Sequence, residues 1–206
     1  MKTSHLLFSI ASGLSILFGG CVSGPDIQRT RPDDVRTLTT GFGASDFQQC
    51  TNQMVDSMLS SQVLANKLAT QFGAKTPVLA FGRIDNRSYN LGLPLDSLGD
   101  SVKIRLINSG KFDVVEMDMN DEITQNILKM MDNPGYNPSD VMNVAGRAVQ
   151  DYILRGYLIE LQETNGVVKD VYYKLTFKLF NMRTGKIDWM DEAEIRKTAK
   201  RGAIGW

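Results

Sequence analysis

Residues 152–180, YILRGYLIELQETNGVVKDVYYKLTFKLF, decide the fold of this chain because they read as two long β-strands joined at Asn165-Gly166. Asn-Gly between alternating apolar residues is the strongest short-range signal for a β-hairpin. A turn at these two residues makes one face of the hairpin apolar, with the pairs Leu158–Tyr173, Gly156–Leu175, Leu154–Phe177 and Tyr152–Leu179. The other face is half aromatic and half cationic, with the pairs Ile159–Tyr172, Tyr157–Lys174, Arg155–Thr176 and Ile153–Lys178.

A second hairpin is predicted to follow, with a three-residue loop at Arg183-Thr184-Gly185 and a strand over residues 186–196. A loop with an odd number of residues keeps Trp189 on the same side of the sheet as Leu179. The strand then carries Ile187, Trp189, Ala193 and Ile195 on that face, and Asp188, Glu192 and Glu194 on the other. In this register Glu194 lies across from Lys174 and Glu192 across from Thr176. The C-terminal third is therefore predicted to be a three-stranded antiparallel meander.

The middle of the chain alternates helical and strand patterns. A helix is expected from Ser45, as N-cap, and a short buried strand follows at residues 78–81. A second helix ends at Gly110, a second strand covers residues 112–115, a third helix starts near Asp121 and breaks at residues 133–135, and a helical pattern resumes after Ser139. The predicted fold class is α/β (α+β): a mixed sheet of about four to five strands, with a C-terminal antiparallel meander and helices packed on it.

The first 24 residues resemble the signal of a bacterial lipoprotein. Lys2 precedes an apolar run from Leu6 to Phe18, and Gly19-Gly20 stand directly before Cys21. The run is shorter than the ~20 apolar residues that a spanning helix needs. We therefore expect a signal peptide at 1–20, a lipidated Cys21 with a flexible tether at 21–44, and a single globular domain at 45–206. By the same resemblance, Val22 after the cysteine favours the periplasmic face of the outer membrane. The alternative is an ordinary signal peptide with an incidental cysteine.

Charge and composition exclude several classes of function. The 206 residues carry 23 basic and 23 acidic side chains, and of these only Lys2 lies within 1–20, so the processed chain has a net charge near −1. A chain this balanced has no long-range field to hold a polyanion, so nucleic acid is not an expected partner. His5, the single histidine, lies in the signal, and no nucleotide, hydrolase or zinc motif is present. We expect no enzymatic activity, cofactor or metal, and we interpret Cys50 as a small buried residue.

Several segments resemble the LpoB-type penicillin-binding-protein activators: residues 45–59, RLINSGKF at 105–112, LRG at 154–156, and YYKLTF at 172–177 with its continuation to Thr184-Gly185 and Trp189. The resemblance extends over roughly residues 40 to 200 and includes the lipoprotein signal. It implies a mixed sheet with helices packed on it, similar to the N-terminal domain of TolB. It also implies an outer-membrane lipoprotein that docks on a bifunctional penicillin-binding protein in the inner membrane and stimulates peptidoglycan synthesis.

A docking surface is predicted from the hairpin pattern, on the polar face around Arg155, Tyr157, Tyr172, Lys174 and Lys178. Tyr and Arg are enriched among the residues that dominate binding energy at interfaces. The alternative is a plain solvated face, because alternating charged residues on an open antiparallel sheet need no partner. The chain is expected to be a monomer. A different function also stays open, that of a structural or secretion-associated envelope lipoprotein with a TolB/CsgG-like domain.

Overall fold

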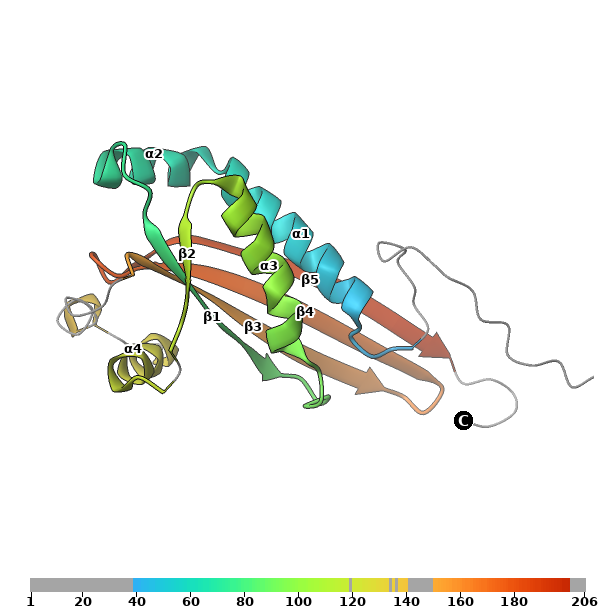
Figure 1. The fold of residues 1–206 in the computed structure, drawn as a ribbon. Coiled ribbons are helices and arrows are strands. Elements are labelled where there is room, and N and C mark those ends of the chain that lie inside the picture. The colour runs from blue at the N-terminus through green and yellow to red at the C-terminus, as the bar shows by residue number, and fades with distance from the viewer. Residues whose placement is uncertain (1–38, 119, 134, 136, 141–149, 201–206) are drawn as a thin grey trace, which may run out of the picture. The chain divides into compact units, whose positions relative to one another are not determined.

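The computed structural model describes residues 39–118, 120–133, 135, 137–140 and 150–200, which contain a five-stranded mixed sheet with helices (Figure 1). The strand order is β2-β1-β3-β4-β5. β1 pairs in parallel with β2 and β3, whereas β3, β4 and β5 are antiparallel neighbours. The fold class predicted from the sequence is confirmed. In chain order the elements are α1 (Ala44–Ser60), α2 (Gln62–Phe72), β1 (Val78–Arg87), α3 (Leu95–Ser109), β2 (Asp113–Glu116), α4 (Glu122–Asp132), β3 (Tyr152–Thr164), β4 (Val168–Asn181) and β5 (Lys186–Lys200).

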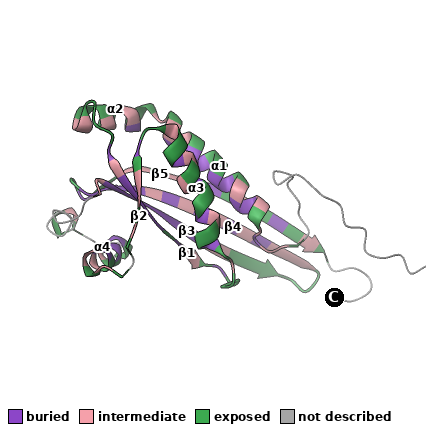
Figure 2. Ribbon diagram, in the orientation of Figure 1, coloured by how far each residue is buried: buried purple, intermediate pink, exposed green. Residues whose placement is uncertain are grey.

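The two faces of the sheet are covered differently. Alternate side chains of β3 and β4, such as Leu154 and Leu175, pack with α1, α2 and α3 in the main core, and this side is called the helical face. The intervening side chains, such as Ile153, point the other way and pack with Ile127 of α4 in a second, smaller cluster, and this side is called the α4 face. Figure 2 shows buried residues running along the strands beneath these helices. A charged residue at an intervening position of β3 therefore faces α4 wherever α4 covers the sheet.

The β3–β4 hairpin has the predicted faces but a different register. Gly166 and Val167 form the turn, and the Asn165 N–H donates to the Val168 carbonyl at 3.2 Å. Gly166 has a φ of 84° at the first central position, where a type II′ turn requires a positive φ. Leu158 consequently pairs with Leu175 instead of Tyr173, a shift of two residues. Because side chains alternate with a period of two, no side chain changes face.

The β4–β5 hairpin follows the prediction except near its loop. Lys174 pairs with Glu194 and Thr176 with Glu192, as expected. The loop has four residues instead of three, since Asn181 pairs with Lys186, and an extra residue in β5 at Asp188 restores the register. This β-bulge moves Ile187 to the α4 face, contrary to the prediction, where it pairs with Phe180 and is 37% exposed.

The folded region begins before residue 45. Phe42 is 3% exposed and its ring packs at a tilt on that of Tyr173, with centroids 5.3 Å apart. Helix α1 has Gly43 as its N-cap instead of Ser45, and the Gly43 N–H donates to the Asp46 carboxylate at 2.7 Å. A carboxylate in the first turn satisfies one of the free N–H groups at the helix start. Residues that the sequence assigns to the tether therefore contribute to the core.

The other elements differ from expectation mainly in their boundaries. The sequence missed α2, in which Leu64 is the one buried residue, so the apolar periodicity is weak. β1 continues to Arg87, with a register irregularity between Phe81 and Ile84, although the polar residues at its end suggested a loop. Cys50 is buried as predicted, and burial raises its pKa to about 11. Residues 1–38, with Cys21, and the helical pattern after residue 140 lie outside the described part of the chain.

Candidate functional site

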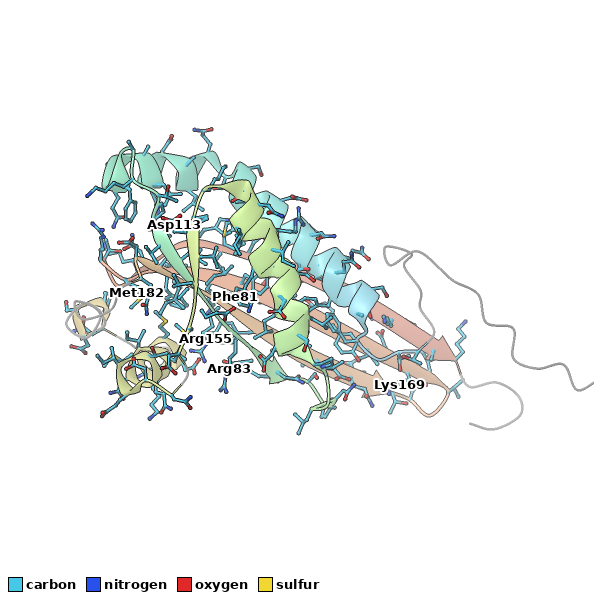
Figure 3. The ribbon with its side chains drawn as sticks, in the orientation of Figure 1. Phe81, Arg83, Asp113, Arg155, Lys169 and Met182 are labelled. Carbon is cyan, nitrogen blue, oxygen red and sulfur yellow. The ribbon has the colours of Figure 1, made fainter. Side chains whose placement is uncertain are left out.

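Arg155 is buried, whereas the sequence pattern suggested a place on an open polar face. β3 is the central strand and α4 lies over this part of it, so only 2% of the Arg155 side chain is exposed (Figure 3). Its guanidinium donates to Asp85 at 2.7 Å, to Asp132 at 2.8 Å and to the Leu128 carbonyl at 2.9 Å. The expectation was wrong because alternation along a strand says which face a residue takes but not what packs on that face.

The contacts of Arg155 fix α4 against the sheet. Asp85 belongs to β1, and Asp132 and Leu128 belong to the last turns of α4, so one side chain joins three elements. A cation near a helix C-terminus is also favoured by the helix dipole. Removing one partner from a buried ion pair typically costs about 3–5 kcal/mol. Among the described residues, the Nε of Arg155 has no hydrogen-bond partner. The other guanidinium contacts make Arg155 a positioning residue.

Tyr157 lies two residues further along β3, and three cations surround its ring. The guanidinium carbons of Arg87 and Arg155 lie 5.0 and 5.3 Å from the ring centroid, and Nζ of Lys178 lies 5.2 Å from it. The side chain is 8% exposed, and burial raises its pKa to about 12. The hydroxyl is therefore protonated at neutral pH and points to the Asp132 carboxylate at 3.5 Å. Each cation–π contact contributes ~0.5–2 kcal/mol, depending on desolvation.

A groove of about 470 Å³ opens beside Tyr157, lined by the end of α4 and by β3, β4 and β5. Lys174 and Lys178 of β4 line it, and the Lys174 ammonium forms an ion pair with the Glu192 carboxylate at 3.2 Å. On β5 the groove includes Ile187 and Met190, and 52% of Met190 is exposed. Tyr, Met and Arg are enriched at interfaces that bind another protein, and Tyr157, Met190 and Arg87 all line this groove. This groove, called the α4 groove, is the best-formed part of the predicted docking surface.

Tyr172 lies on the same face but is not part of the groove lining. It pairs across the sheet with Arg196, and the Glu194 carboxylate beside its hydroxyl raises its pKa to about 12. The structure therefore brings Arg155, Tyr157, Lys174 and Lys178 together and leaves Tyr172 further along β4.

Sequence reasoning missed the residues that complete the cluster, which are Arg87, Asp85 and Asp132. The sequence does contain a signal for Asp85 and Arg87, because these two charged residues lie two positions apart, soon after the apolar residues of the strand. Parallel pairing of β1 with β3 then sets Asp85 beside Tyr157. Asp132 carries no such signal, since its role depends on where α4 docks.

In the residues that the structure describes, no group of three or more His, Cys, Asp or Glu side chains is placed to hold a metal ion. No helix in the same part of the chain is both long and apolar enough to cross a membrane.

A family model described as the peptidoglycan-synthase activator LpoB matches residues 46–195. Among solved structures, the LpoB C-terminal domain from Escherichia coli is 18% identical, with 73% of this chain and 98% of that chain covered and a TM-score of 0.43. The same domain from Salmonella enterica gives 18% identity, the same coverage and a TM-score of 0.42. The NMR structure of E. coli LpoB is 18% identical over 93% of this chain and 89% of that chain, with a TM-score of 0.43. No curated protein matches this sequence.

The matched residues include β1 to β4 entirely and most of β5, together with α1 to α4 apart from the first residues of α1. The family comprises regulatory activators of penicillin-binding proteins and is not a catalytic family. Because the family model covers well over half of the chain, this protein belongs to the LpoB family of peptidoglycan-synthase activators.

Proposed function

We propose that this chain is an outer-membrane lipoprotein, anchored through Cys21, that binds a bifunctional penicillin-binding protein of the inner membrane and stimulates peptidoglycan synthesis. The family match over residues 46–195 is the observation that carries the proposal. The Gly19-Gly20-Cys21 junction behind a short apolar run supports the anchor. Two or more acyl chains on one cysteine suffice for stable anchoring, since each buried CH₂ contributes ~0.8 kcal/mol. The chain acts as a monomer on the periplasmic face of that membrane.

The α4 groove is the proposed docking surface. Lys174 and Lys178 contact the partner from β4, and Tyr157 packs beneath them. Arg155 acts indirectly, because it holds Asp132 and α4 in place and is itself 2% exposed. Tyr172 provides an outlying contact on the same face. A buried aromatic residue within a rim of accessible charges is the arrangement in which a few residues supply most of the binding energy.

Activation without chemistry requires the partner to have two conformations that this chain binds unequally. A tenfold shift in the partner's equilibrium corresponds to about 1.4 kcal/mol of preferential binding to the active conformation. Two interfacial charges and one aromatic contact are sufficient for an energy of that size. The proposal therefore needs a specific surface of ordinary strength and no catalytic group.

The test uses residues 21–206 with Cys21→Ser and a purified bifunctional penicillin-binding protein. Glycan polymerisation and cross-linking are measured while the chain is titrated, and saturable stimulation is the expected result. Lys178→Glu should weaken binding, whereas Lys200→Glu, the same charge change at the far end of β5, should leave it intact. Tyr172→Ala is expected to cost ~1–3 kcal/mol of affinity. Tyr157→Ala is unsuitable as a binding probe because its buried ring also supports the fold.

Absence of both binding and stimulation would reject the proposal. Recovery of a secretion or envelope-assembly component in its place, by pull-down with the same chain, would favour the structural or secretion-associated alternative. Equal binding by the Lys178→Glu and Lys200→Glu variants, with stimulation preserved, would move the docking surface away from the α4 groove.

A further inference from the structure

Among the described residues, the outer edge of strand β1 is unpaired over Gly82–Arg87, six of its ten residues. β1 spans ten residues and pairs with β3 as far as Arg87, opposite Ile159. On its other side β2 pairs only with Val78 to Phe81. Within the described residues, no strand lies against Gly82–Arg87 on that outer side. An edge of this kind presents backbone N–H and C=O groups that can pair with another strand.

This free edge borders a preformed groove. A hollow of about 450 Å³ is lined by residues 83–87 on one side and by Leu91, Leu93, Leu95 and Asp96 on the other. Hydrogen bonds fix the loop that forms the second wall: the Asn86 side chain donates to the Asn90 carbonyl at 2.8 Å, and the Tyr89 N–H donates to Glu160 at 3.0 Å. The same loop holds Leu91 78% exposed. A wall that is already ordered loses little entropy on binding.

The charges along the edge indicate which kind of segment fits. The side chains of Arg83 and Arg87 are 60% and 54% exposed. Asp85, between them, is 12% exposed and is engaged by Arg155 and Arg83. Asp96 lies across the groove on the opposite wall. Arg83 already pairs with Asp85 at 3.0 Å and Arg87 with Asp132 at 3.7 Å, but both side chains stay more than half exposed. Each guanidinium therefore keeps donors for an acidic side chain on a strand laid beside β1.

A second copy of this chain is a poor occupant. Antiparallel pairing of two β1 edges around Asp85 sets Arg83 of each copy opposite Arg87 of the other, and like charges directly opposite destabilise a pair. The outer edge of β5 is also less suitable. It carries the bulge at Asp188 and charges of both signs, such as Glu192 and Arg196, which are devices that prevent strand pairing.

We propose that the edge of β1 over Gly82–Arg87 binds an extended acidic segment of the penicillin-binding protein as an added β-strand, with an apolar side chain of that segment against Leu91. The inference rests on the proposed function for the identity of the partner. Arg87 lines both this hollow and the α4 groove, so the two adjoin at this residue. Backbone pairing supplies affinity in this mode of recognition, and the side chains supply specificity.

The experiment is hydrogen exchange on residues 21–206 with Cys21→Ser, alone and bound to the purified bifunctional penicillin-binding protein. Outward-facing amides of residues 82–87 should exchange quickly in the free chain and about tenfold or more slowly in the complex. Arg83→Gln retains a polar side chain near Asp85. It should raise the Kd about two- to tenfold at low salt and by a smaller factor at high salt. Lys75→Gln, which removes a charge before the other end of β1, is the matched control.

Binding and stimulation without protection of residues 82–87 would overturn the strand-addition inference and leave the proposed function standing. The same holds if Arg83→Gln and Lys75→Gln bind equally well at low salt. Failure of the wild-type chain to bind the synthase would overturn both proposals, since the added strand is assigned to that partner. Protection confined to residues 82–87 and their neighbours, together with a selective effect of Arg83→Gln, would support strand addition.

Discussion

The ion pair between Lys197 and Asp46 provides the sharpest test of how the N-terminal residues join the domain. Lys197 of β5 donates to the Asp46 carboxylate at 2.6 Å and to the Gly41 carbonyl at 2.7 Å. The two side chains are only 6% and 4% exposed. We propose to replace each partner separately, as Lys197→Met and Asp46→Leu, and then both together. These apolar residues keep approximately the volume of the originals.

The single variants should be much less stable than the double variant. Lys197→Met leaves a buried carboxylate whose remaining donor is the Gly43 N–H at 2.7 Å. Breaking a buried pair costs about 3–5 kcal/mol, and the surviving hydrogen bond places the expected loss near ~3 kcal/mol. Asp46→Leu leaves the ammonium with the Gly41 carbonyl and also removes a cap worth ~1 kcal/mol. The double variant removes both charges, so its free energy of unfolding should lie within about 1–2 kcal/mol of wild type.

Urea unfolding followed by circular dichroism measures these free energies, provided that the slope with denaturant is unchanged. Arg196→Met is the control on the neighbouring residue of β5, because Arg196 pairs with Asp170 at an exposed site and should change stability little. Single variants that lose less than ~1 kcal/mol would refute the buried pair. Additive losses in the double variant would refute the coupling between the two groups.

Gly156→Ala sets a Cβ 2.6 Å from a Phe177 ring atom and 2.8 Å from Ile84 Cγ1, so overpacking should lower the free energy of unfolding by ~1–3 kcal/mol; an unchanged Tm would contradict this. Burial raises the pKa of Tyr157 and Tyr173 to about 12 each, above the ~10 of an unfolded tyrosine. The unfolded chain therefore loses these protons first, and stability should hold below pH ~10 and fall as the pH rises towards ~12, less steeply in Tyr157→Phe when unfolding is measured across this range. Cys21→Ala should abolish acylation and retention in the outer membrane, and a processed variant that still sediments with that membrane would contradict the anchor.

The C-terminal meander could be predicted because two independent turn signals agree on one apolar face. The first signal locates the turn without saying which residues are central, and Gly166 rather than Asn165 takes the first central position. A register error of two residues in the β3–β4 hairpin leaves every side chain on its predicted face, so the predicted core residues of this hairpin were still correct. The bulge at Asp188 had no local signal. Its carboxylate accepts from the Tyr152 hydroxyl at 3.0 Å and from the Asn181 amide at 2.6 Å, and these contacts exist only in the folded chain.

The candidate site was predictable only in part, and for a similar reason. Alternation in β3 and β4 correctly assigned Tyr157, Lys174 and Lys178 to one face. It could not show that α4, from an earlier part of the chain, covers Arg155 on that face. The partners of Arg155 come from two other elements, so local pattern carries no information about them.

The attachment of α4 explains why a buried charge lies beneath the proposed docking surface. α4 buries few side chains, chiefly Ile127, Leu128 and Met131, and apolar burial is non-directional, so it does not by itself fix the helix at one position on the sheet. The guanidinium of Arg155 donates to Asp85, Asp132 and the Leu128 carbonyl together. It can do so only when α4 lies at one position on the sheet. The pair therefore contributes more to the position of the helix than to net stability, a role best attested where buried polar groups fix register. Since Asp132 also lines the α4 groove beside Tyr157, the shape of the proposed docking surface depends on a residue that no partner can touch.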